Sequence, residues 1–498
     1  MKKYFIIIFI TILTVVLCIC FIDKNDSSLV NSKVENSIMY GVEEIPNDLS
    51  TVSNLNSSDM DMICFTSKGL VCKNEENKVI PSLASEYVVS NDGIQYEFKI
   101  RDDICWSDGS KITCDDIKEY FRQLIKEEKE ENITSLLNIY GARNYKEGKG
   151  TFDKSVAIKV RDNSIIIRLN KKDSSFLEEL TKPQYRIRKY LVLWKDIRKN
   201  YKSLVFSGDY KIESMDENIV VLKNNNDNEK GIQSINIIRD SSTEQSMAAY
   251  EVGERDIVIN PPESELNKLS EAKKLITVPE NLGVYLVINN HSGNIPLNGR
   301  REIYSNVYNA IVKYQSSNSN EFNVAEGCYF RENQNNLNLI QARKVNSNKK
   351  GEWSAPSILT IIAEDNKINR TVCRAIKDWF AENTKITVKY NLATDEEFND
   401  YELTQKYDMI LVDNKADYKD KEAFYTNFEK YLNETDRNLL EKNRINDYYG
   451  EYYSLEESLF SNYNILPLCF KNKNIALSDK VSSINFDGNG NLNFSDIK

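Results

Sequence analysis

Three charged residues directly follow an apolar run in the last quarter of the chain. Asp408–Val412 has the pattern of a buried strand, and Asp413, Lys415 and Asp417 come immediately after it. In open α/β sheets, ligands bind beyond the carboxyl ends of the strands. A carboxylate fixed there can select a cation, and the lysine can neutralise Asp417, meet a ligand carboxylate or point to solvent. Spacing alone leaves a solvated polar loop open as the alternative.

Few residues in the chain could support catalysis. His291 is the only histidine and has no nucleophile motif near it, and no glycine-rich phosphate loop occurs. The seven cysteines beyond residue 22 lack the CxxC spacing of a zinc site. Acid pairs such as Asp115-Asp116 and Glu396-Glu397 leave a two-carboxylate glycosidase open, but scattered acids usually solvate a surface. We expect a binding protein, not an enzyme, without a cofactor or a bound metal.

Apolar strands and amphipathic helices alternate around the charged segment. The predicted strands are residues 358–363, 386–390 and 408–412. A helix capped by Asn369 follows the first strand, and a helix over 395–405 follows the second. Strands separated by helices predict a parallel sheet. Residues 234–259 carry a second β-α-β pattern, in which Ser242 and Gln245 form a capping box.

Residues 81–125 contain a strand, a turn and a helix in close succession. Tyr96–Ile100 alternates apolar and polar side chains, which is typical of a half-buried strand. Thr113 stands three residues before Asp116, the spacing of a helix N-cap. Ile117, Phe121 and Leu124 then lie on one face of the predicted helix.

The sequence motif of this segment is more specific than its secondary-structure elements. The pattern PSLA-E, DG, Y-x-F-x-I-R-D and WSDG, in that order between Pro81 and Gly109, resembles the domain shared by family 5 extracellular solute-binding proteins. These are the oligopeptide- and dipeptide-binding components of ABC importers. Val205–Ile212, VFSGDYKI, is similar to the family's TGPYKL segment, and residues 465–470 are similar to its crossover between lobes.

The resemblance implies an α/β, periplasmic-binding-protein-like fold (type II, family 5) with two lobes, a hinge and a small extra subdomain. Gln315–Lys350 is Asn/Ser-rich, and we expect long loops there. The implied division is 37–71, 181–285 and 466–498 for lobe I, 72–180 for the extra subdomain, and 286–465 for lobe II.

The resemblance also implies the ligand-binding residues. The stretch DMILV…ADY looks like the family segment in which an aspartate, here Asp417, pairs with the α-ammonium of a bound peptide. Peptide binders have Trp-Gly or Trp-Cys before that Ala-Asp, whereas this chain has Asn414 and Lys415. With Ser207 from the VFSGDYKI segment, Asp417, Asn414 and Lys415 are the predicted ligand-binding residues.

The N-terminus has the features of an export signal. A basic start at Lys2-Lys3 precedes an apolar run from Tyr4 to Ile22. Cys20 or Cys18 is the predicted lipidation site of a lipoprotein, and an uncleaved membrane anchor is the alternative. Residues 1–22 are thus a signal or anchor and 23–36 a tether. Both readings place the chain on the extracytoplasmic face of a bacterial cell membrane.

We therefore expect the substrate-binding protein of an ABC transporter, a monomer that captures short extracellular peptides and delivers them to a membrane permease. The alternatives are a family 5 binder of an oligosaccharide or a metal chelate, and a membrane-anchored sensor or degenerate paralogue that binds without transport. A net charge of −10 and the lack of a basic patch argue against a nucleic-acid partner.

Overall fold

The computed structural model describes residues 36–493 except 54, 75–77, 226–231, 290–294, 319, 348–352, 419–420, 447–451, 482–483 and 487–491. The predicted signal with Cys18 and Cys20, the tether up to residue 35, and His291 lie outside the described residues. Among the helices in the described part of the chain, none is both long and apolar enough to cross a membrane.

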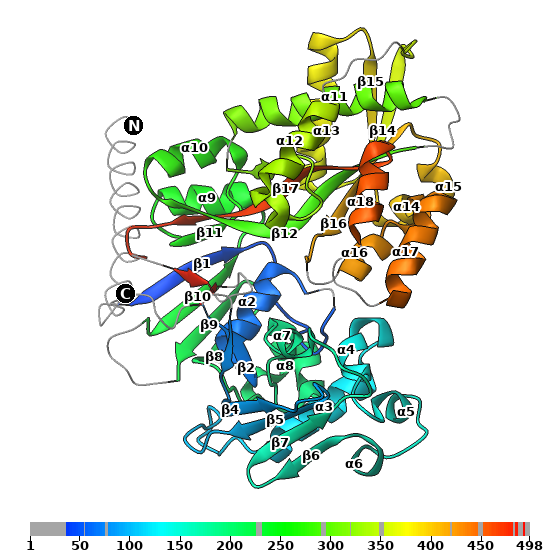
Figure 1. Ribbon diagram of the computed structural model, residues 1–498. Helices are drawn as coiled ribbons and strands as arrows, with labels where there is room; N and C mark the ends of the chain where they lie inside the picture. Colours follow the sequence, from blue (N-terminus) through cyan, green and yellow to red (C-terminus); the bar gives the residue numbers. More distant parts are fainter. Residues whose placement is uncertain are drawn as a thin grey trace, which may run out of the picture.

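One mixed sheet of eleven strands runs through the molecule (Figure 1). Its strands, in spatial order, are β15 (Thr387–Ala393), β14 (Ile358–Glu364), β16 (Met409–Lys415), β12 (Leu275–Ile288), β17 (Ile465–Leu477), β11 (Ile257–Ile259), β1 (Ser37–Val42), β10 (Ser234–Arg239), β9 (Ile219–Asn224) and β8 (Tyr210–Met215), with β13 (Phe322–Val324) paired to β17. β14 is parallel to β15 and β16, and β1 is parallel to β10 and β11. The predicted α/β class is confirmed.

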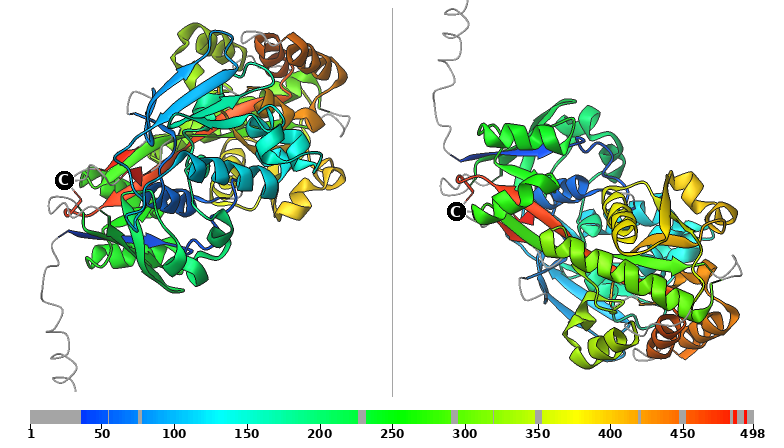
Figure 2. Two further views of the ribbon diagram at one scale, coloured as in Figure 1. Left: turned by 90° about the horizontal axis from the view of Figure 1, so that it is seen from below. Right: turned by 90° about the horizontal axis from the view of Figure 1, so that it is seen from above.

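Helices cover this sheet and the small subdomain (Figure 2). They are α2 (Ser57–Thr66), α3 (Cys114–Glu127), α4 (Thr134–Leu137), α5 (Ala142–Lys146), α6 (Phe152–Ser155), α7 (Phe176–Glu179), α8 (Ile197–Asn200), α9 (Thr243–Glu251), α10 (Glu263–Glu271), α11 (Leu297–Ser317), α12 (Leu337–Ser347), α13 (Lys367–Asn383), α14 (Asp395–Asn399), α15 (Tyr401–Thr404), α16 (Lys421–Thr426), α17 (Glu434–Asn446) and α18 (Tyr452–Ser461).

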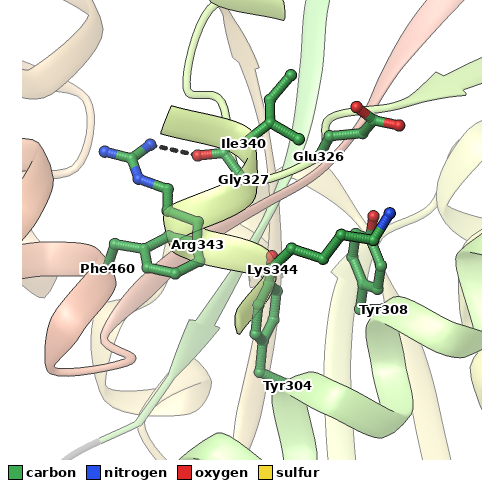
Figure 3. Close-up of a pocket in the computed structure, with 8 residues that line it drawn as sticks. All are labelled: Tyr304, Tyr308, Glu326, Gly327, Ile340, Arg343, Lys344 and Phe460. Atoms are coloured by element: carbon green, nitrogen blue, oxygen red, sulfur yellow. Dashed lines mark hydrogen bonds between the residues drawn. The ribbon is translucent and has the colours of Figure 1, made fainter. Parts of the chain in front are cut away.

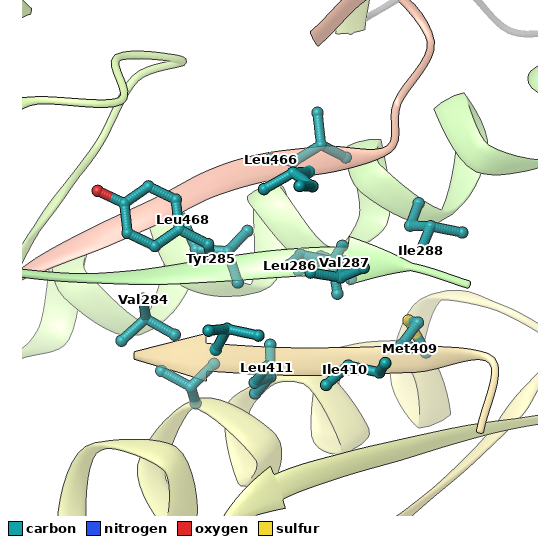
Figure 4. Packing of buried hydrophobic residues seen from close by; sticks show 14 of the residues in the cluster. Val284, Tyr285, Leu286, Val287, Ile288, Met409, Ile410, Leu411, Leu466 and Leu468 are labelled. Carbon is teal, nitrogen blue, oxygen red and sulfur yellow. The ribbon is translucent and has the colours of Figure 1, made fainter. Parts of the chain in front are cut away.

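The two lobes have separate hydrophobic cores. The core of lobe II surrounds β12, β14, β16 and β17 and is covered by α11 and α13 on one face and by α16 and α18 on the other. Val284–Ile288 at its centre is buried throughout, as expected for a strand with helices on both faces (Figure 4). The core of lobe I surrounds β1 and β8–β10, with α2 against them.

A small antiparallel sheet forms the subdomain below lobe I in Figure 1. Its order is β4 (Ala84–Val89), β5 (Gln95–Ile100), β7 (Ser164–Arg168), β6 (Ile158–Arg161), and α3 packs into the same core. The predicted cap of α3 is confirmed, because Asp116 N donates to Thr113 Oγ1 over 3.2 Å and Thr113 N donates to Asp116 Oδ2 over 3.0 Å. The lobe and subdomain boundaries given above stay predictions.

Three local predictions were wrong. Gln315–Lys350 is not a run of loops, because it contains β13, a short 3₁₀-helix at Arg331–Asn335 and α12. Helix α13 is capped by Asn366, whose side chain accepts from Asn369 N, so the helix begins one turn earlier than expected. Residues 395–405 form two short helices, because Asp400 has an extended backbone and caps the second of them.

The two longest strands, β12 and β17, belong to both lobes and form the hinge. They pair antiparallel from Leu275↔Ala476 in lobe I to Val287↔Ile465 in lobe II. The register shifts between them, so that residues 280–282 of β12 bulge opposite Lys471. A bulge interrupts the backbone ladder and leaves carbonyl groups in need of donors.

Arg331 supplies the donors at this bulge. Its Nη2 donates to Glu280 O over 3.2 Å and to Lys471 O over 2.9 Å, one carbonyl from each hinge strand. Its guanidinium also lies 5.3 Å from the centroid of the Phe470 ring. The side chain therefore ties the two hinge strands together where their own hydrogen bonds are missing.

Replacing Arg331 should destabilise the hinge. Arg331→Met keeps an apolar stem over Phe470 but leaves two carbonyls without this donor, which costs about 1–3 kcal/mol. Thermal unfolding followed by circular dichroism should show a lower midpoint. Arg161→Met is the matched control, because Arg161 is exposed and its ion pair with Glu97 is loose, with 3.8 Å between the charged atoms. Equal midpoints for the two variants would contradict the role given to Arg331.

Candidate functional site

The predicted ligand-binding segment is attached to the hinge. β16 pairs antiparallel with β12, with Asn414 opposite Gly283 and Lys415 opposite Leu282. Ala416 N then donates to Asn281 O over 2.8 Å, within the bulge. The residues that lead into Asp417 are therefore held by the part of β12 at which the two lobes are joined.

Asp413 and Asn414 point to opposite faces of the sheet, as successive residues of a strand must. Asp413 faces α13, where its Oδ2 accepts a hydrogen bond from the cap residue Asn366 over 2.7 Å. Burial is the main cause that raises the pKa of Asp413, to about 6. Asp413 is thus a partly buried acid at the start of α13 and lies on the other face from Asn414.

Asn414 holds a helix in place. It is 3% exposed, its Nδ2 donates to Phe424 O over 2.9 Å, and its Oδ1 accepts from Asn427 Nδ2 over 2.8 Å. These bonds fix α16, which follows the Asp417 loop, onto the end of β16. A direct contact between Asn414 and a ligand stays a prediction, as does one from the exposed Lys415.

An aromatic pair lies next to Asp417. Tyr418 packs edge-on against the buried Phe330, with the ring centroids 5.6 Å apart. Lys421 Nζ lies 4.2 Å from the Tyr418 centroid and 5.3 Å from that of Phe330, within range of a cation–π interaction. Although residue 414 is not aromatic, Tyr418 and Phe330 place rings beside the predicted anchor. The ADY wording contains Tyr418, but no local signal pointed to Phe330.

Further charges gather at the hinge beside this segment. Lys471 Nζ lies 3.4 Å from Glu280 Oε2, across the bulge that Arg331 also bridges. Sequence reasoning missed all three residues. Arg331 falls in the stretch expected to be loops, and Glu280 and Lys471 meet only through the pairing of β12 with β17.

Ser207 lies in lobe I and is engaged there. Its buried hydroxyl accepts from Lys68 N over 3.0 Å and donates to Ile187 O over 3.2 Å. The adjacent Gly208 has no room for a side chain, since a Cβ would lie 2.4 Å from Phe65 O. The loop is thus packed tightly on the end of α2. Ligand binding by Ser207 stays a prediction.

A small pocket lies between α11, α12 and α18 (Figure 3). Its lining residues are Tyr304, Tyr308, Glu326, Gly327, Ile340, Arg343, Lys344 and Phe460. Arg343 does not offer a free charge, because it donates to Gly327 O and forms an ion pair with Glu457 over 2.8 Å. Within the described ranges, no cluster of three or more His, Cys, Asp or Glu side chains is placed to hold a metal ion.

Two characterised proteins share part of this sequence. The oligopeptide-binding protein OppA of Bacillus subtilis is 26% identical over 181 residues, which are 36% of this chain and 33% of OppA. The periplasmic murein peptide-binding protein MppA of Escherichia coli is 23% identical over 254 residues, 49% of this chain and 47% of MppA. The similarity in sequence therefore spans between a third and a half of these relatives.

Similarity in structure extends over nearly the whole chain. The crystal structure of Brucella suis NikA in complex with Fe(III)-EDTA matches with a TM-score of 0.71 at 15% identity, covering 93% of this chain and 100% of NikA. The structure of E. coli MppA matches with a TM-score of 0.64 at 18% identity, covering 92% and 96%. At these identities the likeness shows a common two-lobed fold.

The sequence also matches a family model directly. Residues 78–310 match the description "Bacterial extracellular solute-binding proteins, family 5 Middle". This range includes the subdomain, most of lobe I and the first hinge strand. The match covers just under half of the chain, and together with the shared fold it makes this protein similar to the family 5 extracellular solute-binding proteins.

Proposed function

We propose that this protein captures short extracellular peptides and delivers them to the permease of an ABC importer. The observation that carries the proposal is the position of Asp417, a carboxylate one residue beyond the Ala416–Asn281 hydrogen bond that fixes its segment to the hinge. Support also comes from relatives named as oligopeptide- and murein peptide-binding proteins. Among the structural neighbours is Haemophilus influenzae OppA in complex with RPPGFSPFR.

In the proposed mechanism, Asp417 receives the α-ammonium of the peptide. A charge-assisted hydrogen bond of this kind is strong where water is excluded, and it sets the register of the ligand. Asn414 acts indirectly, by holding α16 behind the loop. Lys415 and Lys471 are cations close to the same segment, so either can receive the carboxylate of a short peptide.

Binding would be coupled to movement of the lobes. Asp417 belongs to lobe II, and its segment hydrogen-bonds to the hinge strand β12 that continues into lobe I. A ligand that contacts both lobes therefore favours the arrangement in which they approach each other. The permease would recognise that closed arrangement.

An anionic metal chelate is the second candidate ligand. Compared with the Trp-Gly or Trp-Cys motif of peptide binders, this chain lacks the aromatic residue at position 414 and has a cation at position 415. Lys415, Lys471 and Arg331 lie on paired or directly bonded hinge segments. The structural neighbour NikA was solved with Fe(III)-EDTA, an anionic chelate.

We further propose that the protein is held at the extracytoplasmic face of the membrane through its N-terminus. Lipidation at Cys20 or Cys18 and an uncleaved apolar anchor both remain compatible with the apolar run at residues 4–22. The tether that follows would let the two lobes reach the permease.

Asp417→Asn should weaken peptide binding by roughly 30-fold or more, because removing one partner of a desolvated charge pair costs about 2–5 kcal/mol. Isothermal calorimetry with a free-amine peptide and its N-acetylated form would measure this on the chain without residues 1–22. Asp378→Asn, on the exposed side of α13, is the matched control. Equal binding of both peptide forms would rule out the amine anchor. Tighter binding of Fe(III)-EDTA than of any peptide would favour the chelate.

Adding a ligand that binds should lower the radius of gyration of the protein, because the lobes close around the ligand. Small-angle scattering of the same fragment, with and without saturating ligand, measures the change. Bovine serum albumin in the same two buffers controls for an effect of the ligand on the solvent. A constant radius at saturation would indicate a rigid binder.

Deleting residues 1–22 should move the protein from the membrane fraction to the soluble fraction of its host. Growth with a labelled fatty acid then separates the two anchors. Label that disappears in the Cys18→Ser/Cys20→Ser variant indicates a lipoprotein, and unlabelled membrane-bound protein indicates the uncleaved anchor. Full-length protein recovered from the cytosol would contradict both.

A further inference from the structure

A single tyrosine hydroxyl joins two glutamates between lobe I and lobe II. Tyr314 Oη contacts Glu263 Oε1, and it lies 2.7 Å from Glu321 Oε2. Glu263 is the first residue of α10, Tyr314 lies near the end of α11, and Glu321 immediately precedes β13. We name these three residues the clasp.

The clasp connects parts that belong to different cores. α10 packs on a small cluster that includes Val258 of β11 and Ala476 at the lobe I end of β17. The ring of Tyr314 instead stacks on Phe322 of β13, with the centroids 5.4 Å apart. Glu321 O accepts from Asn472 N, which fixes Glu321 to the hinge strand β17. Any rotation of the lobes about the hinge must therefore change the distances within the clasp.

The clasp contains too few protons when both glutamates are ionised. A tyrosine hydroxyl has one hydrogen, so it can donate to only one carboxylate at a time. The oxygen of the other carboxylate then lies close to Tyr314 Oη with no hydrogen between them. A proton on either carboxyl group turns both contacts into hydrogen bonds and removes the repulsion between the two negative charges.

The surroundings of the clasp favour such a proton on Glu321. Glu321 is only 8% exposed, and burial is the main cause that raises its pKa. The hydrogen bond from Tyr314 lowers this pKa, the charge of Glu263 raises it, and Lys367 and Thr371 of α13 lower it. Cys469 of β17 also faces Glu321.

A cation lies beside Glu263. Arg374 Nη2 of α13 lies 3.5 Å from Glu263 Oε2 in an exposed contact. Two further links across this contact do not involve acids. Lys367 Nζ of α13 donates to Pro261 O, just before α10, over 3.4 Å, and Asn267 Nδ2 of α10 donates to Ser317 O of α11 over 3.5 Å. The part of this contact that varies with pH is therefore the clasp.

We propose that the clasp is a proton-dependent lock on the hinge: a proton shared by Glu263 and Glu321 through Tyr314 holds the two lobes in the arrangement seen here, and ionisation of both acids releases them. Because the pKa of Glu321 is raised while the clasp is formed, the stabilisation is complete at low pH. It is lost as the pH rises through that raised pKa.

The position of the clasp sets the direction of its effect on binding. α10, α11 and α13 lie on the side of the sheet away from the small subdomain, whereas α16, which follows the Asp417 loop, lies on the side facing it (Figures 1 and 2). A rotation that brings the lobes together on the Asp417 side separates them on the clasp side. Resting on the proposed function, this means that the clasp opposes closure, so a peptide should bind more tightly as the pH rises.

The lock can be tested without any ligand, so its failure would not depend on whether the protein binds peptides. Labels on genetically encoded keto amino acids at Val252, the C-cap of α9, and at Leu337 of α12, both 72% exposed, report the distance between the lobes in the full-length protein. Electron–electron double resonance would record this distance over a pH series that starts below the ordinary pKa of glutamate, about 4.3, and extends to about pH 8.

Four variants separate the clasp from other acids. In the wild type, the distance should lengthen as the pH rises. Glu321→Gln should keep the short distance at every pH, because its amide donates to Tyr314 while Tyr314 donates to Glu263, and Glu263→Gln should do the same. Tyr314→Phe should give the long distance at every pH, and Tyr308→Phe, on the same helix, should behave like the wild type. A wild-type distance that does not change with pH, or a pH dependence that persists in Glu321→Gln, would overturn the proposal.

Discussion

The structure depends on two strands that both lobes share. β12 and β17 pair along almost their whole length, so their backbone hydrogen bonds join one end of the molecule to the other. Burying Val284–Ile288 stabilises lobe II by about 1.5–3 kcal/mol for each large apolar side chain, and Ile475 and Leu477 contribute to the core of lobe I. Neither lobe can lose these strands without losing part of its core, and each can rotate only about them.

The backbone pairing of β12 with β17 is interrupted at the bulge of residues 280–282. Charged side chains from both strands and from Arg331 meet there. Arg331 replaces the missing ladder bonds with a side chain, and Glu280 pairs with Lys471 across the same gap. The segment that precedes Asp417 attaches to Asn281, in the middle of the bulge. A ligand charge bound near Asp417 would therefore act on the hinge directly, without a long chain of contacts.

The two faces of lobe II have different tasks because successive strand residues point in opposite directions. Asn414 and the buried rings of Phe424 and Phe330 lie on the face that supports the Asp417 loop. Asp413, α13 and the clasp lie on the other face, where the buried Glu321 and the partly buried Asp413 and Glu263 lie near lysine and arginine side chains. Movement about the hinge links the two faces. In the proposed mechanism, a change in the charge of the clasp therefore changes the affinity for a ligand at Asp417.

The sequence by itself determined the features that depend on near neighbours. The alternation of strands and helices, the capping box of Thr113 and Asp116, and the ADY wording around Asp417 all involve residues a few positions apart, and their prediction needed no knowledge of the fold. Local rules still allow errors of one turn, as at α13, where Asn366 and Asn369 are both good capping residues. Only the tertiary structure decided the partners of Arg331, the aromatic pair of Tyr418 and Phe330, and the meeting of Glu263 with Tyr314 and Glu321. Apart from Tyr314 and Glu321, which are 7 positions apart, these contacts join residues about 50 to 140 positions apart. They exist because the pairing of β12 with β17 folds distant segments onto one hinge.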